Sequence, residues 1–145
     1  MIKGASHVGI SVTDLDAAIA FYRDALDLEE LTTFPFEGPQ FSEVMGLEHV
    51  SGRMSVMRKG TLMLELFEFS NPKPALKDID SPVSNHGISH FGVDVENIEE
   101  TYERLRRAGV RFHSPVRTFP SGMKAAYGRD PDGNVFEILE MTKPP

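Results

Sequence analysis

The chain has 145 residues, of which 40% are hydrophobic and 26% charged, and this composition is typical of one globular domain with a sizeable core. The formal net charge of -7 argues against a nucleic-acid partner, and no segment has the roughly 20 apolar residues that a membrane span requires. Because cysteine is absent, disulfides, thiolate nucleophiles and sulfur metal ligands are excluded, so any metal must be held by nitrogen and oxygen.

The N-terminus does not resemble an export signal. Residues Met1 to Gly4 lead straight into a strand pattern, without an apolar region or a cleavage site. A cytoplasmic protein is therefore expected, with neither membrane insertion nor nucleic-acid binding.

A strand pattern from about Ala5 to Val12 opens the chain. Alternation places three apolar residues on one face of this strand and His7 with Gly9 on the other. Thr13 then provides a candidate N-cap for an amphipathic helix that should run to about Leu26.

Three further strands are expected in the first half of the chain. They are a weaker one from Leu28 to Phe36, one near Arg53 to Met57, and one from Thr61 to Phe69 that carries Glu65. The residues between the first two of these strands are expected to be irregular. Phenylalanine and methionine at strand spacing are expected to be core rather than pocket lining.

A proline-rich loop separates the two halves of the chain. It is marked by Asn71-Pro72-Lys73-Pro74 and Asp80-Ser81-Pro82, and it forms a linker of about residues 70–87. Loops of this length often contact a ligand or act as a lid.

The second half repeats the first. Residues Ser89–Val95 have the pattern of Ser6–Val12, so His90 takes the position of His7. Asn97 is a candidate N-cap for the next helix, which should end at Gly109 because glycine suits a left-handed C-terminal cap.

The last part of the chain again reads as three strands. They are expected near Val110 to Val116, Met123 to Gly128 and Val135 to Met141, with a turn at Asp130–Asn134 before the last one. Residues 143–145 are expected to be a frayed tail.

The last strand patterns of the two halves are also alike. Leu64–Glu68 and Phe136–Glu140 each consist of an apolar residue, a glutamate, two apolar residues and a second glutamate. The sequence therefore predicts a single α+β domain, residues 1–145, built from two tandem βαβββ modules of about residues 5–69 and 88–141. Curved mixed sheets with helices outside should enclose a metal or ligand pocket.

The histidines and the first glutamate of each closing pattern suggest a metal site. Glu65 and Glu137 each lie in a row of large apolar residues, where an ionised carboxylate is costly unless a positive charge meets it. His7 and His90 lie on the corresponding strand faces, and one divalent cation would satisfy all four side chains. Nitrogen and oxygen donors accept Zn, Ni, Co, Mn or Fe, and open coordination positions would allow catalysis.

The other polar candidates have no such pattern. The second glutamates, Glu68 and Glu140, lie on the opposite strand faces and are expected to be solvated. His49, His86 and His113 have no repeat partner and are expected in surface or loop positions. Arg53 and Arg117 are candidate anion contacts.

The duplicated pattern, with histidine at both openings and glutamate at both closings, resembles the vicinal oxygen chelate superfamily of glyoxalases, epimerases, extradiol dioxygenases and resistance proteins. The resemblance runs from His7 to Glu140 and includes the Asp130–Asn134 turn and the Phe21-Tyr22 pair. It implies a glyoxalase-like fold, one divalent metal ion and a homodimer. The metal ligands that it implies are His7, Glu65, His90 and Glu137.

The resemblance also implies a reaction on a small-molecule substrate. In a lyase or isomerase like glyoxalase I or methylmalonyl-CoA epimerase, Glu137 would take the proton next to a carbonyl while the metal stabilises the enolate, with Glu65 as a second candidate base. Glyoxalase I usually has an arginine for the glutathione carboxylate four residues after its first ligand, and here Ser11 stands there. Glutathione is therefore not favoured.

Two alternatives stay open. An extradiol dioxygenase would hold Fe(II) with His7, His90 and Glu137, which leaves Glu65 surplus. A non-enzymatic drug-binding protein of the bleomycin-resistance type would lack the metal ligands, so the presence of all four ligand types counts against it.

Overall fold

The two sequence repeats fold into two compact units, the first of residues 1–76 and the second beginning at Lys77. The structure is a computed structural model that describes residues 1–141. The tail expected at residues 143–145 lies outside the described part of the chain.

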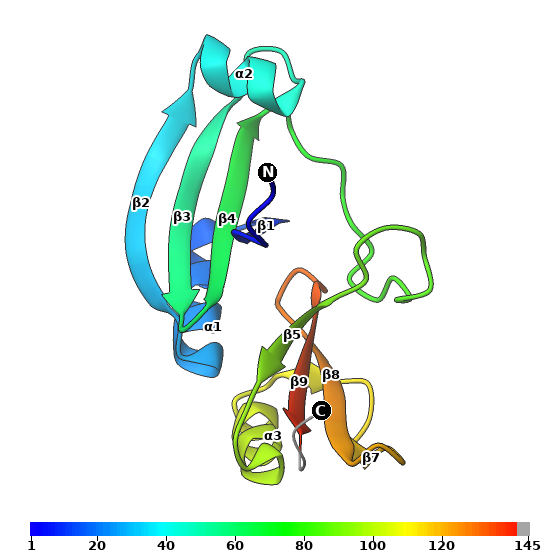
Figure 1. Ribbon diagram of the computed structural model, residues 1–145. Helices are drawn as coiled ribbons and strands as arrows, with labels where there is room; N and C mark the ends of the chain where they lie inside the picture. The colour runs from blue at the N-terminus through cyan, green and yellow to red at the C-terminus, as the bar shows by residue number, and fades with distance from the viewer. Residues whose placement is uncertain (142–145) are drawn as a thin grey trace. The chain divides into compact units, whose positions relative to one another are not determined.

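The first unit is a four-stranded mixed sheet with two helices. Its sheet has the order β1-β4-β3-β2, in which β1 runs parallel to β4 and the other pairs are antiparallel. Figure 1 shows β2, β3 and β4 curving side by side. The elements are β1 (Val8–Ser11), α1 (Leu15–Leu26), β2 (Glu29–Glu37), α2 (Pro39–Met45), β3 (Ser51–Lys59) and β4 (Leu62–Asn71).

Both faces of this sheet are packed. The apolar stripe of α1 lies against β3 and β4, where Leu64 and Leu66 are fully buried. The alternate residues of β4 point to the other face and join an aromatic cluster there. The residues of this cluster are Phe34, Phe36, Phe41, Met45, Val50, Met54, Val56, Phe67 and Phe69. The phenylalanines and methionines at strand spacing are therefore core, as predicted.

The short helix α2 replaces the irregular stretch that the sequence predicted. Pro39 is at the start of the helix, where its fixed φ suits the first turn and its missing N–H leaves no bond unmade. Gly46 ends it with a left-handed conformation at φ 66°. Phe41 and Met45 lie on one face of α2 and pack against the aromatic cluster, but the helix has only 7 residues, too few for a helical period to be recognised in the sequence.

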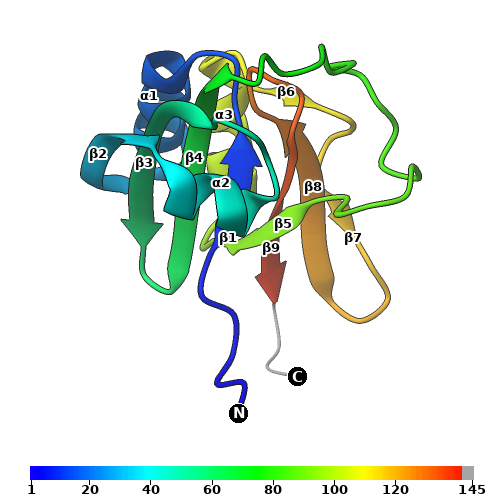
Figure 2. The same ribbon diagram turned by 90° about the horizontal axis from the view of Figure 1, so that it is seen from above.

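The second unit repeats the same topology. Its sheet has the order β5-β9-β8-β6, with β7 also paired to β8, and β5 runs parallel to β9. Figure 2 shows β9 beside β8. The elements are β5 (Phe91–Asp94), α3 (Ile98–Arg107), β6 (Arg111–Phe112), β7 (Arg117–Thr118), β8 (Met123–Arg129) and β9 (Val135–Met141). The fold is thus α+β with two mixed sheets, as predicted.

One predicted strand of the second unit is divided. The pattern from Val110 to Val116 becomes the two short strands β6 and β7, and Pro115 lies between them. Proline has no N–H to donate to a neighbouring strand, so pairing with β8 stops before it and resumes beyond it. Residues 72–90, which include most of the predicted linker, contain neither helix nor strand. None of the helices in residues 1–141 has the length and apolarity needed to cross a membrane.

The N-terminus of α1 is held by two carboxylates. Asp14, rather than the expected Thr13, is the N-cap, and its side chain accepts a hydrogen bond of 3.0 Å from the N–H of Ala17. The N–H of Leu15 donates to Oε2 of Glu68 on β4 over 2.6 Å. The negative charge of Glu68 also suits the positive end of the helix dipole.

The second unit uses its corresponding glutamate in the same way. Asn97 is the N-cap of α3 but makes no capping bond with its side chain. Instead, Glu140 of β9 accepts hydrogen bonds from the N–H groups of Asn97 at 2.8 Å and Ile98 at 3.4 Å. The expectation that Glu68 and Glu140 are solvated is therefore wrong, because both close the N-terminus of a helix.

Candidate metal centre

The first unit brings His7 and Glu65 together. His7 immediately precedes β1, and Glu65 lies on β4, the parallel neighbour of β1, in register with Gly9. Nε2 of His7 lies 3.2 Å from Oε2 of Glu65. The two side chains are 38% and 25% exposed, so the pair is open to a ligand from solvent.

The second unit has the same arrangement. His90 precedes β5, and Glu137 lies on the parallel neighbour β9 in register with Gly92. Nε2 of His90 lies 3.3 Å from Oε2 of Glu137, and these side chains are 27% and 15% exposed. A Cβ atom at Gly92 would lie 3.0 Å from Leu139 and 3.8 Å from the Glu137 carboxylate, so glycine leaves room beside the pair.

Each histidine has a serine on its other ring nitrogen. Oγ of Ser6 lies 3.0 Å from Nδ1 of His7, and Oγ of Ser89 lies 2.8 Å from Nδ1 of His90. In both units Nε2 therefore faces the carboxylate while Nδ1 faces a hydroxyl group.

These pairs fit two ligands of a divalent metal. With metal–ligand bonds of about 2.0 to 2.2 Å, adjacent ligands of one ion lie about 2.8 to 3.6 Å apart. Both Nε2–Oε2 distances, 3.2 and 3.3 Å, fall in that range. Among residues 1–141, no three or more His, Asp and Glu side chains are grouped to hold a metal ion. The predicted ligands come as one pair in each unit.

Tyr127 distinguishes the second pair from the first. Its hydroxyl oxygen lies 3.3 Å from Nε2 of His90, and it stands opposite Glu137 across the β8–β9 hairpin. The corresponding residue opposite Glu65 is Val56. Burial, and then the Glu137 carboxylate, raise the pKa of Tyr127. No sequence pattern singled out Tyr127, although the turn at residues 130–134 sets the hairpin register that places it there.

The same carboxylate lines a cavity within the second unit. The cavity has a volume of about 310 Å³, a size that suits a small molecule. Its polar lining includes Glu137, Tyr127, His113 and Arg117, and its apolar lining includes Phe119. The cavity therefore combines one carboxylate and one arginine with an apolar wall.

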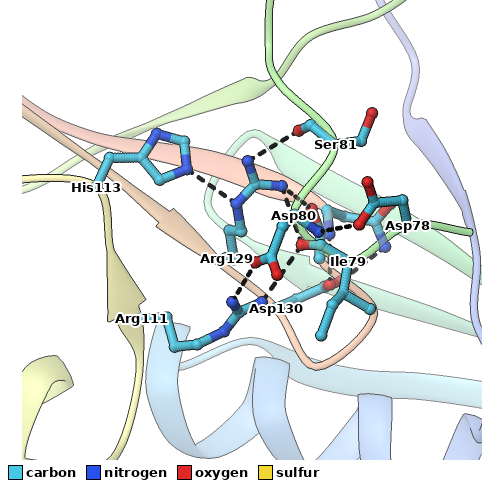
Figure 3. A network of polar contacts seen from close by, with 10 residues as sticks. Asp78, Ile79, Asp80, Ser81, Arg111, His113, Arg129 and Asp130 are labelled. Atoms are coloured by element: carbon cyan, nitrogen blue, oxygen red, sulfur yellow. Dashed lines mark hydrogen bonds and ion pairs between the residues drawn. The ribbon is translucent and has the colours of Figure 1, made fainter.

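A buried arginine next to this cavity binds the backbone in the middle of the linker. Arg129 is only 8% exposed and donates to the backbone oxygens of Ile79, Ser81 and Gly133 at 3.2, 2.9 and 2.9 Å (Figure 3). Its Nε donates to Nε2 of His113 over 2.9 Å. Arg129 therefore ties residues 79–81, near the start of the second unit, to strand β8 and positions a residue of the cavity lining.

His113 lies in a loop, as expected, but it has a role that the sequence did not indicate. To accept from Arg129, its ring must be neutral with a lone pair on Nε2. Burial, followed by the nearby charges of Arg129 and Arg111, lowers the pKa of His113. Arg111 in turn donates to Asp80 of the linker over 2.6 Å. Of the two arginines expected at an anion, Arg117 lines the cavity and Arg53 pairs with Asp16.

Residues 4–138 match the sequence profile of the Glyoxalase/Bleomycin resistance protein/Dioxygenase superfamily. The chain belongs to this superfamily. Members of the Glyoxalase/Bleomycin resistance protein/Dioxygenase superfamily include lyases such as glyoxalase, typically bind a divalent metal and a small-molecule substrate, and often form dimers.

Solved structures of superfamily members resemble the chain over nearly its whole length. A glyoxalase family protein from Bacillus cereus is 25% identical with a TM-score of 0.87, and the match covers 97% of this chain and 95% of that one. A glyoxalase/bleomycin resistance protein/dioxygenase domain from Frankia is 27% identical with a TM-score of 0.69, covering 99% and 95%. Lactoylglutathione lyase from Agrobacterium tumefaciens is 26% identical with a TM-score of 0.64, covering 96% and 94%.

Proposed function

We propose that the protein is a divalent-metal-dependent lyase or isomerase that removes a proton next to a carbonyl group of a small-molecule substrate. One ion, of Zn, Ni, Co, Mn or Fe, would be held by His7, Glu65, His90 and Glu137. The observation that carries the proposal is the repeated His–Glu pair, with Nε2–Oε2 distances of 3.2 and 3.3 Å in a superfamily whose members bind metals.

The proposal makes the two units parts of one functional domain, residues 1–145, because neither pair alone supplies enough ligands for a stable site. Two donors leave most positions of a four- to six-coordinate ion to water, whereas four protein donors leave one or two open. We also propose that the chain works as a homodimer, as superfamily members often do.

Glu137 is the proposed general base. When bound, the metal would polarise the substrate carbonyl and stabilise the negative charge that develops on its oxygen. The Glu137 carboxylate would accept the proton from the neighbouring carbon and then return it to the substrate. Its place in the lining of the 310 Å³ cavity supports this role, and the apolar wall at Phe119 would help to exclude water. Glu65 is the second candidate base.

Elemental analysis of protein purified without chelator tests the proposed class. We expect one ion of Zn, Ni, Co, Mn or Fe per chain, without oxygen uptake on catechols. Stoichiometric iron, with oxygen uptake on catechols, would favour the dioxygenase alternative. Protein without a divalent metal would favour a binding protein and would overturn the proposed reaction.

The base is tested by proton exchange in D2O, followed by NMR on a panel of hemithioacetals and 2-substituted acyl thioesters. We expect the wild type to exchange the proton next to the carbonyl of at least one substrate. Glu137→Gln should slow that exchange by about 100-fold to 10,000-fold, the usual contribution of a general base. Glu29→Gln, an exposed glutamate on β2, is the control and should exchange normally. Equal rates in Glu137→Gln and the wild type would rule out Glu137 as the base.

A further inference from the structure

A serine hydroxyl contacts Nδ1 of each proposed ligand histidine, at 3.0 Å for Ser6 and His7 and at 2.8 Å for Ser89 and His90. We propose that Ser6 and Ser89 are positioning residues that orient these two imidazoles and, when metal is bound, stabilise the tautomer that binds it through Nε2. The inference rests on the proposed metal site and adds two residues to it.

The chemistry of a neutral imidazole requires such a partner. One ring nitrogen carries the proton and the other carries the lone pair, and a metal binds only the lone pair. Because Nε2 is the nitrogen that faces the carboxylate in both units, Nδ1 must hold the proton when metal is bound. The oxygen of the serine hydroxyl accepts this N–H, which stabilises the metal-binding tautomer when metal is bound and orients the ring.

The serine hydroxyl can also form a hydrogen bond with Nδ1 of the His–Glu pair when no metal is bound. In that state His7 can carry its proton on Nε2 and donate to Glu65, and the hydroxyl of Ser6 then rotates to donate to Nδ1. A carboxylate or a carbonyl oxygen could only accept at this position. Serine therefore stabilises the pair in both states, and the imidazole can change tautomer when the metal enters.

The sequence supports a specific role for these serines. Both proposed ligand histidines follow a serine directly, whereas His49, His86 and His113 follow glutamate, asparagine and phenylalanine. The Ser-His dipeptide thus occurs at the two equivalent repeat positions and nowhere else in the chain.

We expect Ser89 to contribute more to metal binding than Ser6 does. The contact between Ser89 and His90 is shorter and partly buried, and the His90 side chain is less exposed than that of His7, at 27% against 38%. Water can therefore replace the hydroxyl of Ser6 more readily than that of Ser89. Loss of Ser89 should be the more damaging change.

Zinc titration of the metal-free protein measures how much each serine contributes to metal affinity. Ser89→Ala should weaken zinc binding about 10-fold or more, as loss of an outer-shell partner usually does, and Ser6→Ala should weaken it less. Ser89→Thr keeps the hydroxyl and should bind zinc nearly as well as the wild type. Ser11→Ala, which changes an exposed serine at the end of β1, is the control and should bind normally.

Nitrogen-15 NMR of the histidine rings provides a second readout that a purely structural role would not change. Zinc-loaded wild type should show His90 with its proton on Nδ1. In metal-free protein, Ser89→Ala should change the tautomer balance of His90 but leave that of His7 unaltered, and Ser89→Thr should restore the wild-type balance. Thermal melts of all variants exclude a loss of folding as the cause.

The outcomes separate this inference from the proposed function. A wild type that binds no zinc stoichiometrically would contradict the metal site itself. A wild type that binds zinc, together with a Ser89→Ala variant of equal affinity and unchanged tautomers, would leave the metal site standing and overturn the role of the serines.

Discussion

Single residues beside the candidate site distinguish the two repeats, although their His–Glu pairs are equivalent. Tyr127 stands opposite Glu137, whereas Val56 stands opposite Glu65. A phenol can donate a hydrogen bond near the reacting group and a valine cannot. This difference, together with the cavity beside Glu137, is why Glu137 is the better candidate for the base.

The bond between Arg129 and His113 predicts a pH dependence of stability. The pKa of His113 lies below its ordinary value of 6.5 in the folded chain, because burial and the adjacent arginines oppose its protonation. As the pH falls, the unfolded chain therefore binds the proton first. The stabilisation is fully present above pH 6.5 and is lost as the pH falls from 6.5 toward the folded pKa.

The measurement is the melting temperature between about pH 7 and about pH 5, where a histidine changes its charge. His113→Gln, whose side-chain oxygen can still accept from Arg129, should lose less of its melting temperature over this interval than the wild type does. His86→Gln changes an exposed histidine of the linker and should follow the wild type. Parallel curves for all three proteins would contradict the prediction.

Each closing strand serves two purposes through residues on its opposite faces. In β4, Glu65 meets His7, whereas Glu68 accepts from the N-terminus of α1. In β9, Glu137 meets His90, whereas Glu140 accepts from the N-terminus of α3. Because side chains alternate along a strand, two glutamates three residues apart point to opposite faces. The same short pattern therefore builds both the site and the attachment of the helix.

Removal of a helix-capping carboxylate should reduce stability. We expect Glu68→Ala and Glu140→Ala each to lower the free energy of unfolding by about 0.5 to 2 kcal/mol, the usual cost of losing a cap. The measurement is denaturation with urea. Glu29→Ala removes the same side chain from an exposed position of β2 and should change stability little. If the Glu68 and Glu140 variants were as stable as the Glu29 variant, the capping bonds would contribute nothing.

At the scale of the whole molecule, two units of one topology each carry half of a proposed ligand set. If one ion needs both pairs, loss of one histidine in either unit should abolish binding rather than halve it. We expect His7→Ala and His90→Ala each to lose the full metal content while keeping the fold, measured by elemental analysis and circular dichroism. A variant that keeps about half of the metal would instead indicate independent sites, and unchanged content would refute the ligand assignment.

The sequence alone predicted most of the architecture, apart from α2 and the division into β6 and β7, because the patterns are local and occur in both halves of the chain. Alternation of apolar residues predicted the strands, helical spacing predicted α1 and α3, and the repeat from Ser6–Val12 to Ser89–Val95 predicted two equivalent modules. The structure brings His7 to Glu65 and His90 to Glu137, two pairs from the predicted set of four ligands. Their assembly around one ion stays a prediction.

Only the tertiary structure decided the contacts made between elements distant in the chain. The capping by Glu68 and Glu140, the hold of Arg129 on linker residues 79–81, and the place of Tyr127 beside His90 depend on strand register and loop path. A periodic pattern shows which face a residue occupies but not which group from another element meets it there. That is settled by packing, because each buried polar group must find its partner in three dimensions.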